Sequence, residues 1–130
     1  MTMTNIIRYS SKFKRHYKRV SKDPGWRKVF HDKISIEITW TKQEFISFDF
    51  VITCLEKDIT IPKYFYAHPI TLPKKMIQRL KSTFGDTYTK IECLELHFDG
   101  HNGDHLLIYA KNTVAKLVYL LEIGTHSELF

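Results

Sequence analysis

Cysteine is scarce in this chain, and long apolar runs are absent. The two cysteines, Cys54 and Cys93, lie far apart and lack CxxC spacing, so we expect buried free thiols rather than a disulfide or a zinc cage. No apolar run approaches the length that crosses a bilayer, and the start MTMTNIIRYS has no apolar stretch behind a basic leader. We therefore expect a cytoplasmic protein that does not contact membranes.

Glycine and proline are also few, at 5 and 4 of 130 residues, and the chain has no internal repeat and no low-complexity linker. Apolar residues make up 43% of the chain and charged residues 26%, which is the balance of an ordinary globular protein. A chain of this length is large enough for one hydrophobic core and too short for two. We therefore expect a single domain over residues 1–130.

Acidic residues are nearly missing near the N-terminus. Nine of the 20 Lys and Arg residues lie between Arg8 and Lys28, where the only acid is Asp23, and the whole chain carries a net charge of +6. Basic groups gain affinity for nucleic acid by releasing condensed counterions, so this asymmetry favours a phosphate-facing surface. A solvated helix face would have the same composition, and an acidic protein partner would use the same surface.

Hydrophobic spacing predicts helices first and strands afterwards. Helix starts are indicated at Ser10 or Ser11, at the capping-box pair Thr41 and Glu44, and at residues 71–73. The expected elements are a strand over 4–9, a helix from 11 to 20, a strand over 34–40, a helix over 41–56, a helix over 73–84, and strands over 87–98, 105–110 and 113–123. This order is typical of an α+β protein, with N-terminal helices packed on a C-terminal antiparallel sheet of about four strands.

A dense group of titratable residues follows the first of the C-terminal strands. Period-two alternation places Glu95 and His97 on one face of that strand, and the turn after it supplies His101, Asp104 and His105. Imidazole exchanges protons near neutral pH and carboxylates orient it, so this pattern favours proton transfer. We interpret His101 as a solvated loop residue outside the site.

A metal centre is the competing interpretation of the same residues. His97, His101 and His105 recur at every fourth position, and histidine is a common zinc ligand. Gly100 and Gly103 interrupt the helix that would align the three rings. We therefore expect neither a metal nor another cofactor.

The C-terminal third of the chain resembles the catalytic sheet of RelE/YafQ-type toxins. The resemblance rests on an acid-x-His strand end, an Asp-containing turn, an apolar strand ending in Ile-Tyr and the terminal motif Gly-Thr-His-x-x-Leu-Phe, all contained in LELHFDGHNGDHLLIYAKNTVAKLVYLLEIGTHSELF. Upstream, Tyr9-Ser10, Ile61-Pro62 and Ala67-His68-Pro69 match further family segments. Residues 21–40 and 73–90 stand as apparent insertions relative to compact members.

The resemblance implies a RelE/ParE-like fold and metal-independent cleavage of messenger RNA in the ribosomal A site, where the ribose 2′-hydroxyl attacks the adjacent phosphate. It implies His97 and Asp104 on the base side, His126 as the general acid, His68 in phosphate contact or proton transfer, Glu95 as a further catalytic residue, and His105 and Phe130 in substrate positioning. Two residues depart from the pattern. Glu95 stands where Asp is usual, and His105 stands where an aromatic Trp is usual, although an imidazole also stacks on bases.

The resemblance also implies two kinds of partner. Messenger RNA and ribosomal RNA would meet the basic helix, with Lys14, Arg15 and Lys18 as candidate contacts, and a cognate acidic antitoxin would bind the toxin. Three alternatives remain open, namely a ParE-like gyrase-directed toxin, a metal-dependent nuclease and a non-catalytic RNA-binding module. The terminal pair His126 and Phe130 favours the nuclease, because a pure binding module needs no imidazole at that place.

Overall fold

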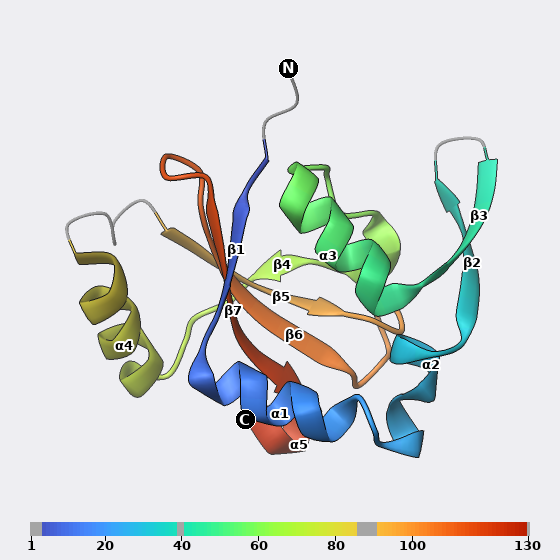
Figure 1. Cartoon of the computed structure of the whole chain (residues 1–130), viewed down its shortest axis with the longest axis horizontal. Helices are drawn as coiled ribbons and strands as arrows, with labels where there is room; N and C mark the ends of the chain where they lie inside the picture. The colour runs from blue at the N-terminus through green and yellow to red at the C-terminus, as the bar shows by residue number, and fades with distance from the viewer. Residues whose placement is uncertain (1–3, 39–40, 86–90, 130) are drawn as a thin grey trace.

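The computed structural model describes residues 4–38, 41–85 and 91–129, and the α+β class predicted from the sequence is confirmed (Figure 1). The first half of the chain forms β1 (Ile6–Tyr9), α1 (Ser11–Val20), η1 (Pro24–Trp26), α2 (Arg27–Phe30), β2 (Lys33–Ile38), β3 (Thr41–Ile46) and α3 (Ser47–Lys57). The second half forms η2 (Lys63–Phe65), β4 (His68–Pro69), α4 (Lys74–Phe84), β5 (Ile91–His97), β6 (Leu106–Asn112), β7 (Leu117–Gly124) and α5 (His126–Leu129). No helix in the described part is long and apolar enough to cross a membrane.

The main sheet has five strands in the order β1-β7-β6-β5-β4. The three pairings among β4, β5, β6 and β7 are antiparallel, as expected, and β1 adds a parallel edge strand to β7. Parallel pairing requires a long connection between the two strands, and here nearly the whole chain separates them. The two-residue strand β4 at the other edge matters most for the site, because its register sets His68 directly opposite Glu95.

Each face of the main sheet is covered by a different set of helices. On one face, Leu96 of β5 and Leu120 of β7 belong to a core that includes Phe13 of α1 and Val51 of α3. On the other face, Ile108 of β6 packs with residues of α4 in a smaller core that also contains Leu80, Ala110 and Leu121. The alternation predicted for β5 is confirmed, since its even-numbered apolar residues enter the first core while Cys93 packs against the second.

The expected helix over 41–56 is wrong in its first part. Residues 41–46 form β3, which pairs with β2 in an antiparallel two-stranded sheet, and the helix begins only at Ser47. The capping-box spacing of Thr41 and Glu44 is therefore coincidental. The pairing is a tertiary effect, because Phe45 lies opposite Ile34 and both pack against the main core. The strand expected over 34–40 is confirmed up to Ile38, and its last two residues lie outside the described ranges.

The turn after β5 is organised around the carboxylate of Asp99. Asp99 accepts hydrogen bonds from the backbone N–H of His105 at 3.3 Å and from its Nδ1 at 2.6 Å, and the Lys28 ammonium lies 3.3 Å away. Burial by itself would raise the pKa of Asp99, but these partners lower it to about 2. A Cβ at Gly103 would come within 1.9 Å of Asp99 Oδ1, so any other residue here would displace the Asp99 carboxylate from its partners. The turn therefore depends on an ionised Asp99.

We predict that Asp99→Asn destabilises the protein in a pH-dependent way. A carboxylate whose pKa falls from 3.8 to about 2 on folding stabilises the native state above its ordinary pKa, and this contribution is lost as pH falls through that window. At pH 5 the variant should therefore lose about 2 kcal/mol of unfolding free energy, and the difference should shrink towards pH 2. Urea titrations across this range measure it.

Asp32→Asn is the matched control, because Asp32 forms only a half-exposed ion pair with Arg27. Such a surface pair contributes little to stability, so the control should differ from the wild type by less than about 0.5 kcal/mol. An equal effect of the two substitutions would show that the turn does not depend on the ionised Asp99.

Candidate functional site

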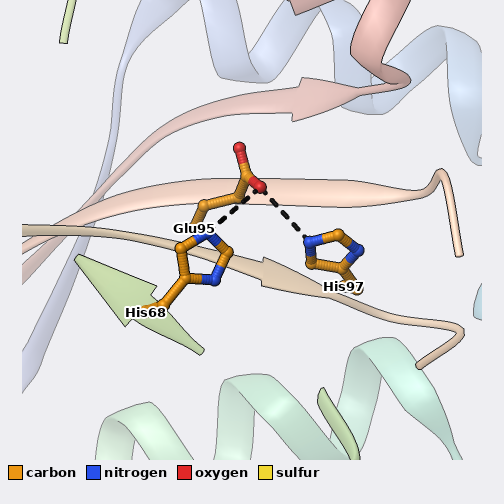
Figure 2. A group of neighbouring side chains, drawn as sticks. All are labelled: His68, Glu95 and His97. Atoms are coloured by element: carbon orange, nitrogen blue, oxygen red, sulfur yellow. Dashed lines mark ion pairs between the residues drawn. The ribbon is translucent and has the colours of Figure 1, made fainter. Parts of the chain in front are cut away.

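The candidate site is centred on the buried carboxylate of Glu95 on β5 (Figure 2). The Nε2 atom of His97 lies 3.2 Å from Glu95 Oε1, and the Nε2 atom of His68 lies 3.5 Å from the same oxygen. Strand geometry explains both contacts. His97 is two residues further along the same face of β5, and His68 is the register partner of Glu95 on β4.

Backbone carbonyls orient the two imidazoles. His97 Nδ1 lies 2.9 Å from the carbonyl oxygen of Gly103, and His68 Nδ1 lies 2.8 Å from that of Tyr66. A carbonyl only accepts hydrogen bonds, so each Nδ1 carries the proton and donates it. In this tautomer each Nε2 keeps its lone pair, and that of His97, which lies 3.2 Å from Glu95 Oε1 without a hydrogen-bond partner among the described residues, is available to a proton or a cation.

His126 brings a third imidazole to the same carboxylate from the opposite end of the chain. It begins α5, and its Nε2 lies 4.0 Å from Glu95 Oε1. Asp104 holds it in place, because Asp104 Oδ1 accepts the His126 backbone N–H at 2.8 Å and its Nδ1 at 2.6 Å. The backbone hydrogen bond from His126, followed by its side chain, lowers the pKa of Asp104. Asp104 is thus the partner of His126 rather than of His97.

The cluster has a buried floor and an open mouth. Glu95 and His97 are each 5% exposed, whereas about half of the His126 side chain is accessible to solvent. A buried carboxylate is costly unless it is paired, and here three imidazoles provide the compensating charge or protons. The arrangement can therefore accept a proton at a buried imidazole and deliver one at an exposed imidazole.

Two histidines near the cluster make other contacts. His105, expected to position substrate, is held by Asp99 and packs edge-on against Trp26 with ring centroids 4.5 Å apart. His101, interpreted as a solvated residue, is exposed but packs edge-on against Tyr66 at 4.1 Å. Stacking of His105 on a base stays a prediction, and its ring would have to leave Trp26 to provide it.

Tyr66 is the site residue that the sequence pattern did not reveal. Its ring centroid lies 4.5 Å from that of His68 and 5.5 Å from that of His97, and its carbonyl orients His68. Its backbone is left-handed, with φ of 49°, which is uncommon for an aromatic residue. The available signal was its position two residues before His68, since a residue at that spacing can accept from the histidine.

The remaining expected site residues lie apart from the cluster. Lys14, Arg15 and Lys18 are exposed on α1, which packs along β7. Arg19 of the same helix pairs with Glu128 of α5, so α1 is tied to the short helix that carries His126. Phe130, expected to position substrate, lies outside the described residues.

A metal ion fits part of the cluster. One ligand atom from each of His68, Glu95 and His97 lies within 4.8 Å of the others. Two of these separations, 3.2 and 3.5 Å, are close to the roughly 3.4 Å between ligand atoms bound to a tetrahedral zinc ion. The metal site that the spacing of His97, His101 and His105 suggested is not formed. The ring of His101 packs against Tyr66, and that of His105 is bound by Asp99.

Comparisons with known proteins bear on the fold. No family model matches the chain, and no curated protein matches it. A metal-bound toxin from Helicobacter pylori superposes with a TM-score of 0.58 at 20% identity, over 98% of this chain and 100% of that one. YafQ from E. coli, in its complex with DinJ, gives 0.54 at 17% identity, over 98% and 99%. The chain therefore has the fold of the RelE/YafQ-type toxins.

Proposed function

We propose that this protein is the toxin of a toxin–antitoxin pair and that it is an endoribonuclease, cleaving messenger RNA on the ribosome by metal-independent acid–base catalysis. One observation carries the proposal: three imidazole Nε2 atoms converge on the carboxylate of Glu95, one from a buried ring and one from an exposed ring on the C-terminal helix. The fold supports it, since one superposed structure is YafQ in a toxin–antitoxin complex.

In the proposed reaction, His97 accepts the proton of the ribose 2′-hydroxyl. The 2′-oxygen forms a bond to the adjacent phosphorus, and the bond between phosphorus and the 5′-oxygen breaks. Glu95 stabilises the imidazolium that forms on His97, from 3.2 Å. A positioned imidazole of this kind accelerates proton transfer by about 10²- to 10⁴-fold.

His126 donates the proton that the leaving 5′-oxygen requires, so the products are a 2′,3′-cyclic phosphate and a 5′-hydroxyl. Asp104 supports this role, because its carboxylate stabilises the protonated ring. His68, partly exposed beside Glu95, contacts the phosphate and balances its developing charge. The site thus places its base in the interior and its acid at the mouth.

The proposed partners are messenger RNA in the ribosomal A site, ribosomal RNA and an acidic antitoxin, and the proposed place of action is the cytoplasm, where ribosomes are. Lys14, Arg15 and Lys18 form an exposed basic surface for ribosomal RNA. A ParE-like action on gyrase would not use the histidine cluster. A metal-dependent nuclease is the second candidate, because the spacing of His68, Glu95 and His97 suits a zinc ion.

We predict that expression of the chain without an antitoxin stops growth by arresting translation. The cause would be cleavage of messages inside ribosomes, so incorporation of labelled methionine should fall before DNA synthesis does. Continued protein synthesis during growth arrest would contradict the proposal and favour gyrase as the target.

We predict that His126→Gln lowers the single-turnover cleavage rate on programmed ribosomes by about 10²-fold or more, because it removes the general acid. Ribosome affinity should be unchanged, since the backbone N–H that binds Asp104 is retained. His31→Gln, at an exposed histidine that directly follows α2, is the matched control and should cleave at the wild-type rate. A fast His126→Gln variant at saturating ribosomes would remove His126 from the mechanism.

The same assay separates binding from chemistry. Neutralising Lys14, Arg15 and Lys18 together should weaken ribosome pelleting and flatten its salt dependence, because fewer counterions are released. Cleavage within the complexes that still form should persist. A loss of cleavage at saturating ribosomes with unchanged pelleting would contradict this division.

We predict that cleavage survives EDTA once magnesium has been restored to keep ribosomes intact, because the proposed proton transfers need no metal. Added zinc should inhibit, since it would take the Nε2 lone pairs of His68 and His97. Loss of activity in chelator, with recovery on zinc or manganese, would establish the metal-dependent alternative instead.

A further inference from the structure

A cationic groove of about 700 Å³ lies between α1 and α4, outside the histidine cluster. Its walls carry Lys12 and Arg15 from α1, and Lys75 and Arg79 from α4. Among the residues that the structure describes, those that line the groove include no acidic one. Figure 1 shows how the lower end of α4 approaches the N-terminal end of α1 across the edge of the main sheet. The groove therefore concentrates positive charge from two helices that are far apart in the sequence.

The groove opens on the face of the sheet that carries the cluster. Tyr119, at its floor, is the register partner of Ala110, which pairs with Cys93. Directly paired residues share a face, and Cys93 shares its face with Glu95. Two strand spacings separate β7 from β5, so the floor lies about 10 Å across the sheet from the Glu95 strand.

A buried ion cluster fixes one wall. Glu122 of β7 is fully buried, and it lies 2.5 Å from His16 Nδ1 and 3.3 Å from Lys12 Nζ. Glu122 occupies the same sheet row as Glu95, with Ile108 between them. Lys12 is thereby engaged by Glu122, so the positive charge that α1 offers to an anion in the groove comes from Arg15, which lies one turn after Lys12 and is exposed.

The lining chemistry favours a phosphate backbone over a peptide. The leucines of the floor, Leu80 and Leu121, are only 2% and 8% exposed, so the apolar part of the lining that a ligand can reach is Met76 and Tyr119, and these two do not form the continuous stripe that an amphipathic helix needs. Hydroxyl and amide groups of Ser11, Gln78 and Ser82 line the walls, and they suit phosphate and sugar oxygens. The half-buried ring of Tyr119 provides a surface on which a base can stack.

We propose that this groove, in the space between α1 and α4, binds the single-stranded RNA that flanks the cleaved bond, and that the RNA reaches it from the histidine cluster by passing over the side chains that cover β6. The inference rests on the proposed RNA cleavage and adds a second contact region to it. Lys75 and Arg79 are the residues that distinguish it, because they lie on α4 and not on the basic face of α1.

The test uses a fluorescent octanucleotide of 2′-O-methyl RNA, which lacks the attacking hydroxyl and so reports binding alone. For Lys75→Ala with Arg79→Ala, we expect about tenfold weaker binding in anisotropy titrations, and a slope of log affinity against log salt that is smaller by about 1.4, from two lost phosphate contacts on a single strand. The control removes the same charge at Lys33 and Lys57, which are exposed on β2 and α3 and do not line the groove.

Binding and salt slope equal to those of the control would overturn the inference. So would preferential binding of an amphipathic Glu/Leu peptide through Lys75 and Arg79, which would make the groove a protein-docking surface. If the double variant loses RNA binding while the wild type cleaves no message on ribosomes, the groove inference stands and the proposed nuclease function fails. If the wild type cleaves message on ribosomes and the double variant binds RNA normally, the proposed nuclease function stands and the groove inference fails.

Discussion

The candidate site depends on one unfavourable placement, the burial of the Glu95 carboxylate in the sheet. A carboxylate removed from water must be protonated or must be compensated by positive charge or donors close by. Three imidazoles provide this compensation, and each is brought by a different part of the chain: His68 by the edge strand β4, His97 by β5 itself and His126 by α5. Their arrangement around one oxygen is the basis of the proposed proton transfer.

Supporting contacts keep the rings pointed at that carboxylate. The turn after β5 does this for two of them, since Gly103 supplies the carbonyl for His97 and Asp104 supplies the carboxylate for His126. Asp99 anchors this turn through its hydrogen bonds to His105. Its carboxylate occupies the space that a side chain at position 103 would need. The contact between Asp99 and His105 and the orientation of the cluster's imidazoles thus depend on the same short segment, residues 99–105.

A second buried carboxylate on the sheet is compensated in the same way. Glu122 is buried in the row of Glu95, and Lys12 and His16 compensate it from α1. This pairing attaches the basic helix to β7 and leaves its outer cations exposed. Together with α4, which lies in one of the apparent insertions predicted from the sequence, it creates a positive region next to the histidine cluster.

Local patterns determined much of this protein, and tertiary contacts decided the rest. The periodicity of α1, α4 and the C-terminal strands was readable from the sequence, as was the shared face of Glu95 and His97, because these features follow from backbone geometry within one element. The strand β3 was not, since its pairing with β2 overrides a helix-start signal at Thr41. The break expected between residues 110 and 113 was wrong, since β6 continues to Asn112 and the turn before β7 covers residues 113–116. The resemblance predicted His68, Asp104 and His126 as site residues, but it did not predict that Asp104 binds His126. Neither the pattern nor the resemblance pointed to Tyr66, which packs against His68. The contacts of Asp104 with His126 and of Tyr66 with His97 join residues distant in the chain, so only the folded sheet determines them.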